Sequence, residues 1–304
     1  MGKIISIIGS NSFLASYLIE EFGDDETIEL NLFARRKTEH AVCKARVNQL
    51  PFNYPVDDLN LASLLASDVI IYCAAAGVQA ASSLTDIDEV YAINAFLPIR
   101  IITYLSANSF SGKWISFGTY FEIGDNAALQ SYSEEEIVAS NLSVPNHYCC
   151  SKRLLTKFID CRQFTIQAWH LVLPTIYGAK ENKQRLIPYV IEMLKKQELP
   201  LLSAGTQIRQ YVHCLDVVKL LRIIIDENPP YGIYNVTAAE TLAIKDLVKA
   251  MFSLFGQDPK GSLGARNSRD ESMQVLQLES TKIGRAIPSW SPRIRLQEGL
   301  QEYL

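Results

Sequence analysis

Tyr148 and Lys152 are the two residues of this sequence whose types and spacing point most directly to chemistry. Residues four apart on a helix share one face, so the phenol and the ammonium would lie side by side. A neighbouring cation favours the phenolate, and we expect it to lower the pKa of this tyrosine. Such a phenol can give a proton to a carbonyl oxygen, or take one from a hydroxyl, while a hydride moves. The pair therefore predicts acid–base catalysis coupled to hydride transfer.

A glycine turn near the N-terminus is the second feature with chemical meaning. Gly9 follows a short apolar run, and Ser12, Phe13 and Leu14 begin a segment with helical spacing. A strand, a glycine turn and a helix favour a dinucleotide site, because the free amides of the helix start can hold a pyrophosphate. The usual three-glycine pattern is incomplete, since Ser12 and Ala15 occupy the second and third places. An ordinary strand-to-helix turn without a ligand is the alternative on this motif alone.

The end of the second predicted strand bears on which dinucleotide would bind. An NAD site carries an acidic residue there for the ribose hydroxyls, whereas this chain has Arg35 and Arg36. Guanidinium groups suit the 2′-phosphate of NADP. The sequence thus favours NADP(H) over NAD, the alternative being a solvated basic turn.

Alternating strands and helices must position these residues. Over residues 1–174 the pattern predicts a Rossmann-type, doubly wound parallel α/β sheet that forms the NADP-binding domain. Strands are expected at 3–8, 29–33, 68–73, 113–117 and 165–173, and helices at 13–22, 58–65, 86–108 and 146–161. Residues 175–304 are expected to form a smaller mixed α/β substrate-binding region packed on the first, and the chain could cross back. Its helices are expected at 186–196, 215–226, 242–255 and 296–304, with short strands near 201 and 234.

The composition excludes several classes of protein. Apolar residues make up 48% of the 304 residues and the net charge is −4, which argues against disorder and against a nucleic-acid surface. The six cysteines contain no CxxC pair, so we expect reduced thiols and no metal site. No apolar run approaches the roughly 20 residues of a membrane span. The N-terminus shows no cleavage pattern, so a cytoplasmic protein is expected.

Taken together, these segments resemble the extended short-chain dehydrogenase/reductase family, specifically its nucleotide-sugar (NAD-dependent epimerase/dehydratase) branch. The similarity runs through nearly the whole chain, and covers the Gly9 turn, 74–77, Asn94, 116–121, Tyr148 with Lys152, 173–178, 185–188, 205–216 and 292–300. The stretch 205–216 is similar to the family's G-x-Q-x-R-D-[FY]-[VI]-H-V-x-D element, with Gln210 in place of the usual aspartate.

The resemblance implies roles for individual residues. Lys152 would hold the nicotinamide ribose, and Tyr148 would be the acid and base. Arg209 would bind the diphosphate of a nucleotide sugar, and Arg185 could line the same pocket. For these two arginines the alternative is an ordinary surface position. His213 would be structural. The expected cofactor contacts are completed by Ala74, Ala75 and Pro174, and the expected substrate contacts by Thr175 and Gln207.

The family's catalytic serine or threonine is displaced in this chain. It usually stands four residues before an aromatic, and if Phe121 is that aromatic, Phe117 occupies the place. Side chains alternate along a strand, so Thr119 lies on the same side as Phe117 if the strand continues. We expect Thr119 to supply the catalytic hydroxyl, with Ser116 as the reserve.

The residues after that position separate the possible reactions. Dehydratases of this branch carry an Asp-Glu pair there, whereas this chain has Gly118 and Thr119 and no carboxylate before Glu122, so dehydration is disfavoured. An epimerase usually keeps NAD, whereas Arg35 and Arg36 favour NADPH, which a reductase consumes.

Residues 180–218 are most similar to enzymes that reduce a nucleotide-linked 4-keto-6-deoxyhexose. The resemblance therefore implies an NADPH-dependent reductase of such a sugar, in deoxysugar and O-antigen (lipopolysaccharide) biosynthesis. The alternatives are a nucleotide-sugar 4-epimerase with tightly bound NAD and a non-catalytic NADP-binding protein of the same fold. The family also implies a homodimer, formed through the helices near 86–108 and 146–161.

Overall fold

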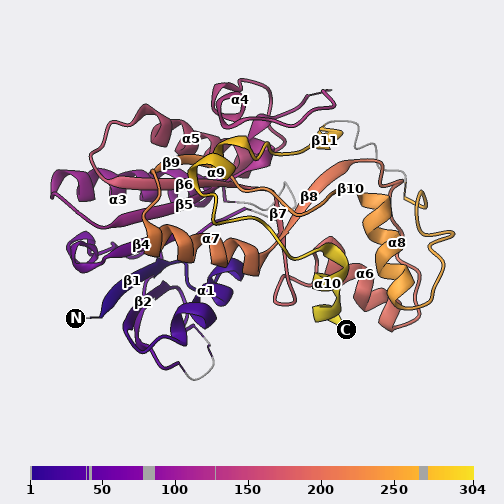
Figure 1. Ribbon diagram of the computed structural model, residues 1–304, viewed down its shortest axis with the longest axis horizontal. Helices are drawn as coiled ribbons and strands as arrows, with labels where there is room; N and C mark the ends of the chain where they lie inside the picture. Colours follow the sequence, from indigo (N-terminus) through magenta and orange to yellow (C-terminus); the bar gives the residue numbers. More distant parts are fainter. Residues whose placement is uncertain (1, 39, 41–42, 78–85, 127, 267–272) are drawn as a thin grey trace.

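A seven-stranded parallel sheet forms the larger part of the protein (Figure 1). The computed structural model describes residues 2–38, 40, 43–77, 86–126, 128–266 and 273–304. In spatial order the strands are β3 (Arg46–Pro51), β2 (Ile28–Ala34), β1 (Lys3–Ile8), β4 (Val69–Tyr72), β5 (Lys113–Thr119), β6 (Gln167–Leu173) and β9 (Gly232–Asn235). The chain order reverses between β1 and β4, which is where doubly wound sheets bind their ligands. The predicted fold class is confirmed.

Each face of this sheet is buried under helices. One core layer joins the sheet to α1 (Phe13–Gly23) and α7 (Cys214–Glu227). The other joins it to α3 (Leu97–Ala107) and α5 (His147–Cys161). The all-apolar sequence of β4 follows from burial on both faces, as is usual for central parallel strands.

The helix expected at 86–108 is interrupted. It comprises α2 (Ile87–Tyr91), a π-helical turn η2 (Ala92–Phe96) and α3. Pro98 has no amide hydrogen to give to the carbonyl of Asn94, which explains why the regular ladder is lost here. The combined helix Ile87–Ala107 is also long and apolar enough to span a membrane by composition, which the sequence analysis did not recognise. Its inner face packs on the sheet through Leu97, Ile101 and Leu105.

A second, smaller sheet lies beside the first. Its central strand β8 (Ile208–His213) pairs with β7 (Thr175–Tyr177), β10 (Thr241–Ala243) and β11 (Val275–Leu276). A third apolar cluster joins this part to α6 (Leu186–Lys195), α8 (Ile244–Leu254), α10 (Leu296–Gly299) and the 3₁₀ turn η4 (Leu300–Tyr303).

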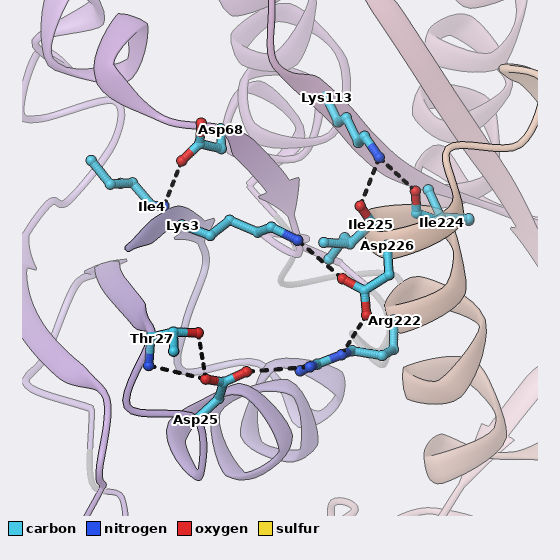
Figure 2. A network of polar contacts seen from close by, with 10 residues as sticks. All are labelled: Lys3, Ile4, Asp25, Thr27, Asp68, Lys113, Arg222, Ile224, Ile225 and Asp226. Carbon is cyan, nitrogen blue, oxygen red and sulfur yellow. Dashed lines mark hydrogen bonds and ion pairs between the residues drawn. The ribbon is translucent and has the colours of Figure 1, made fainter. Parts of the chain in front are cut away.

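The chain returns to the large sheet after residue 174. Strand β9 pairs with β6, and α7 packs against α1. Polar contacts reinforce this return (Figure 2): Asp226 accepts a hydrogen bond from Lys3 at 3.0 Å, and Arg222 lies 3.2 Å from Asp25. Lys113, at the start of β5, donates to the last carbonyls of α7. Residues 214–235 therefore belong physically to the large sheet.

Some elements differ from the sequence prediction. The edge strand β3 was missed because RVNQLP is polar and only partly buried, so its alternation is weak. The helix expected at 58–65 is a 3₁₀ turn, η1 (Leu61–Ala66). No named strand forms near 201, where Leu202 makes an isolated bridge with Leu263. Two short helices, α4 (Glu134–Ala139) and α9 (Thr281–Ala286), lie in stretches for which no element was predicted.

Candidate active site

The glycine turn after β1 meets the loop after β4 at the carboxyl edge of the sheet. Gly9 has a φ of +87°, and a Cβ atom there would lie 2.4 Å from the backbone nitrogen of Ala74. Only glycine fits this close contact between two loops. Ser12 caps α1 through its hydroxyl, which accepts a long bond of 3.4 Å from the amide of Ala15. The first turn of α1 holds no acidic residue, so its amides can bind an anion.

Two hollows adjoin this turn. One, of about 370 Å³, is lined by apolar and aromatic residues suited to a nucleotide base, namely Phe33, Phe52, Tyr54, Ala74, Ala75 and neighbours including Gly9 and Ser12. The other, of about 750 Å³, is polar and basic, and is lined by Ser10, Asn11, Ser12, Ser16, Arg35, Arg36, Lys37, Thr38 and Asn53. The shapes and donors present therefore fit a dinucleotide.

The remaining expected cofactor residues take different positions. Leu14 is buried in the core, so its side chain does not line the site. Phe13 borders a further hollow at the start of α1, and Pro174 is buried at the link from β6 to β7. Ser10 and Thr38 also line the basic hollow and were not predicted from the sequence. Their hydroxyls are 2.7 Å apart. Their signal was only a serine and a threonine beside the predicted turn and strand end.

Arg35 and Arg36 both border the basic hollow. Arg35 is 67% exposed and lies 3.4 Å from a carboxylate oxygen of Glu89. An exposed ion pair of that length is weak, so the guanidinium can turn towards a bound phosphate. The backbone amide of Arg36 donates to Asn11, which fixes the turn that carries both arginines.

Helix α5 places Tyr148 and Lys152 on one face, as the spacing predicted. The Lys152 ammonium lies 5.9 Å from the centroid of the Tyr148 ring and donates to the Phe117 carbonyl at 3.0 Å. The helix begins sharply just before Tyr148, because the Asn146 side chain accepts from the amide of Cys149. The lysine is thus anchored to the end of β5 and faces the phenol.

The pKa of Tyr148 differs from the sequence expectation. Burial raises the pKa of this phenol, and the nearby Cys149 and Glu122 add to the increase. Burial also lowers the pKa of Lys152 to about 8, opposed by Glu122 and Cys73. The expected lowering of the tyrosine pKa is therefore wrong for the protein alone, because burial decides the direction of the shift. The Tyr148 phenol is therefore protonated at neutral pH, as an unperturbed tyrosine is, and in the protein alone it is a weaker acid than a free tyrosine.

The two candidate hydroxyls lie in different surroundings. Thr119 ends β5 and begins the 3₁₀ turn η3 (Tyr120–Ile123), where its hydroxyl caps the turn by accepting from backbone amides, one of them a long 3.5 Å bond from Phe121. Ser116 is fully buried, and its hydroxyl hydrogen-bonds Nδ1 of His170 at 2.9 Å. The geometry favours Thr119 as the available hydroxyl and occupies Ser116 elsewhere.

Arg185 is the first of the two arginines that were expected to bind substrate. Arg185 begins α6, forms a 3.1 Å ion pair with Glu181, and has its guanidinium 5.9 Å from the Phe13 ring. Its charge also lowers the pKa of Tyr148, which places it near the catalytic phenol. The buried carboxylate of Glu181 therefore fixes the Arg185 guanidinium, whose charge acts on Tyr148.

Arg209 comes from β8 and is almost fully buried. One of its terminal nitrogens donates to the carbonyls of Ile208 and Met273, both at 2.8 Å. Burial raises the pKa of Tyr120, and its hydrogen bond with Thr175, whose hydroxyl lies 2.6 Å away, and the charge of Arg209 oppose that rise. Arg185 acts on the same tyrosine, so the two arginines share this region. Gln207 is buried two residues before Arg209.

Further residues of this region were not predicted or have structural roles. Burial raises the pKa of Tyr120 and of Tyr211, and the charges of Arg185 and Arg209 oppose that rise in both. The sequence marked these two tyrosines only as aromatic residues beside the expected motifs. His213 accepts from the amide of Leu215 and contacts Glu302, consistent with a structural role. The Gln210 amide both donates to and accepts from the backbone of Leu278, which an aspartate could not do.

Several known proteins are similar to this chain. A family model described as the NAD dependent epimerase/dehydratase family matches residues 5–237. CDP-abequose synthase of Salmonella muenchen is 22% identical over 228 residues, which is 72% of this chain and 71% of that protein. A trifunctional UDP-glucose 4,6-dehydratase/UDP-4-keto-6-deoxy-D-glucose 3,5-epimerase/UDP-4-keto-L-rhamnose-reductase of Arabidopsis thaliana is 25% identical over 128 residues, 42% of this chain and only 19% of that protein.

Solved structures resemble the whole chain. MoeE5 in complex with UDP-glucuronic acid and NAD has a TM-score of 0.80 at 18% identity, covering 99% of this chain and 97% of that one. UDP-glucuronic acid 4-epimerase from Bacillus cereus, in complex with UDP-glucuronic acid and NAD, has a TM-score of 0.81 at 16% identity, covering 99% and 98%. At these identities the likeness shows the fold.

Proposed function

Because this chain belongs to the NAD dependent epimerase/dehydratase family, we propose that it is an NADPH-dependent 4-ketoreductase of a nucleotide-linked 4-keto-6-deoxyhexose. The family makes it an enzyme that modifies nucleotide sugars; the direction, cofactor and sugar are the proposal. The observation that carries it is the site's set of acids: a protonated Tyr148 beside Lys152, with no carboxylate directly after Thr119. This set suits protonation of a carbonyl oxygen better than removal of a C5 proton.

The proposed mechanism assigns one task to each residue. The bound nicotinamide would supply a hydride to C4 of the sugar. Tyr148 gives its proton to the C4 oxygen as that oxygen gains negative charge, and Thr119 donates a hydrogen bond to the same oxygen. Lys152 holds the nicotinamide ribose and supports the phenolate that remains. Arg185 and Arg209 hold the substrate diphosphate, and Thr175 and Gln207 lie beside them.

The proposed cofactor preference can be tested separately from the reaction. Replacing both Arg35 and Arg36 by alanine should weaken NADPH binding about 10- to 100-fold, because charged hydrogen bonds to a phosphate are lost. NADH lacks that phosphate, so its affinity should change less than about twofold. Fluorescence titration measures both, and Arg46→Ala, an exposed arginine on β3, is the matched control. Equal weakening of NADPH and NADH binding would remove the case for NADP.

The proposed reaction is tested with a panel of substrates. The purified protein is mixed with NADPH and with CDP-, dTDP-, GDP- or UDP-linked 4-keto-6-deoxy sugars made in place by the matching dehydratases. NADPH oxidation with one of them supports the reductase and identifies the nucleotide. Sugar interconversion without net oxidation, with NAD retained by the protein, would favour the 4-epimerase. Binding of NADPH without either reaction would favour a non-catalytic protein.

We also propose that the protein acts in the cytoplasm as a homodimer in deoxysugar biosynthesis. Ile87, Phe96 and Leu154 are exposed apolar residues on the helices α2–η2–α3 and α5, and α2 contacts α5. Burying such a surface against a second copy is favourable. Sedimentation equilibrium should give twice the 34.1 kDa mass of the chain, and Phe96→Ser should shift the protein towards that single mass. A wild-type monomer at micromolar concentration would contradict the dimer.

A further inference from the structure

A closed polar cluster lies beside Lys152, between β5, β6, α5 and η3. Its members are fully or almost fully buried: Ser116, Glu122, Thr156 and His170. The His170 ring bridges two of them, with Nδ1 2.9 Å from the Ser116 hydroxyl and Nε2 2.9 Å from the Thr156 hydroxyl. The Thr156 hydroxyl also lies 3.2 Å from the Lys152 carbonyl. The proposed reaction gives this cluster no task.

The Glu122 carboxyl is the chemically unusual member. Its Oε1 accepts the Thr119 amide at 2.7 Å, whereas its buried Oε2 has no hydrogen-bond partner among the residues the structure describes. A Cβ atom on Gly118 would lie 2.8 Å from Oε1 of Glu122, 2.8 Å from Nε2 of His170 and 3.3 Å from the Thr156 hydroxyl. The absence of a side chain at Gly118 thus lets these three groups converge.

The same backbone segment holds the catalytic lysine. Lys152 donates to the carbonyl of Phe117, the residue directly before Gly118. The amide that binds Glu122 belongs to Thr119, the residue directly after it. Glu122 and Lys152 therefore hold the two ends of one three-residue stretch at the end of β5, and this stretch carries the proposed catalytic hydroxyl.

A buried carboxylate with an open oxygen is costly unless a cation balances it. His170 is no such cation, because burial lowers its pKa to about 3 and keeps the ring neutral. Arg153 points part of its charge at the backbone, with its Nε donating to the Glu122 carbonyl at 2.8 Å. The titratable and charged groups facing Glu122 and Lys152 are Cys73 after β4, His170 on β6, and Tyr148, Cys149 and Arg153 on α5. Lys152 and Arg153 both act on the Glu122 carboxyl, and of these two cations Lys152 is the one that faces the Tyr148 ring.

We propose that Glu122 is a positioning residue for Lys152, whose buried carboxylate keeps the lysine charged beside Tyr148. The assignment rests on the proposed function only in giving Tyr148 and Lys152 the catalytic work. Burial raises the pKa of Glu122 to about 7, opposed first by hydrogen bonding from Thr156 and the Thr119 amide and then by the charge of Lys152. Above that pH the ionised carboxylate favours the ammonium, so it extends the pH range over which Lys152 stays charged.

The test is Glu122→Gln, which keeps the shape and the oxygen that accepts from Thr119 but cannot ionise. The pH titration of Lys152 is followed by NMR of ¹³C-lysine-labelled protein, with its signal assigned by loss in Lys152→Arg. Lys152 should lose its proton about one pH unit lower in Glu122→Gln, a roughly tenfold loss of proton affinity. The alkaline limb of the NADPH oxidation rate should move by the same amount.

Glu136→Gln is the matched control. Glu136 closes the same kind of capping box on the exposed start of α4, with Ser133 in the place of Thr119. It should leave the Lys152 titration unchanged. A folded Glu122→Gln variant in which Lys152 titrates as in the wild type overturns the proposal, and so does an equal shift in both variants.

Two further cases are a variant that does not fold and a protein that reduces none of the sugars. If Glu122→Gln does not fold, the ¹³C-lysine titration of the wild type decides: a Lys152 signal that also responds to pH near 7, where Glu122 ionises, supports the proposal, and a signal that changes only in the single step of its own titration overturns it. If the Lys152 shift appears but no nucleotide sugar oxidises NADPH, the Glu122 assignment holds and the reductase proposal fails.

Discussion

Replacing Tyr148 by phenylalanine should lower turnover roughly 10²- to 10⁴-fold and leave NADPH binding nearly unchanged. The phenol is the partly buried proton donor of the proposed reaction, and it is protonated at neutral pH. Phenylalanine keeps the ring that faces the Lys152 ammonium, so the cofactor side of the site should survive. Initial rates of NADPH oxidation measure the first effect, and a fluorescence titration with NADPH measures the second.

Tyr91→Phe is the control for this substitution. Tyr91 ends α2 and contacts the His147 ring, outside the proposed catalytic group. It should retain turnover within about twofold, as surface changes usually do. Retained turnover in Tyr148→Phe would remove the proton-donor role, and a matching loss of NADPH binding would show that the residue serves the cofactor site instead.

Replacing Gly9 by alanine is expected to abolish measurable NADPH binding, a loss of at least about 100-fold, and to destabilise the fold. The left-handed backbone costs an alanine roughly 1–2 kcal/mol. The added Cβ would also lie 2.4 Å and 2.5 Å from the backbone N and Cα of Ala74, neither of which is a flexible side chain. The loops after β1 and β4 must then separate, which disrupts the hollow expected to hold the dinucleotide. Binding is measured by titration and stability by thermal unfolding.

Gly256→Ala separates the two causes. Gly256 has a φ of +63°, but nothing lies within 4 Å of its Cβ position. It should show the backbone cost alone, about 1–2 kcal/mol, with NADPH binding unchanged. A Gly9→Ala variant that binds NADPH as tightly as Gly256→Ala would contradict the close contact as the reason for glycine.

Local signals explain which parts of the fold were predictable. The strands β1 and β4 are short, mostly apolar and mostly buried runs, and the phenol and ammonium of α5 need only helical spacing to face each other. The polar edge strand β3 carries no such pattern, because one side of it has no neighbouring strand to bury it. The break in the helix before Pro98 was readable from the proline but was not used.

The parts of the site that depend on tertiary packing were not predictable. The expected fall in the Tyr148 pKa rested on one neighbouring charge, whereas burial by the rest of the protein decides the sign. His170 lies 54 residues from Ser116 in sequence, and only the pairing of β5 with β6 brings the two side chains together. Glu181 and Arg185 stand four residues apart, so their ion pair was possible from the sequence. No feature of the neighbouring sequence indicated that the Glu181 carboxylate would be buried.

The return of α7 and β9 to the large sheet bears on how this enzyme could acquire a new specificity by recombination. A single exchange point at residue 174 would replace the strand beside β6 and the partners of Asp25 and Lys3 together with the substrate pocket. A chimera that keeps its own sheet intact must therefore exchange two separate pieces, 175–213 and 236–304, and retain 214–235. Transplanting a sugar preference between relatives thus requires at least three junctions, at 174/175, 213/214 and 235/236, instead of one.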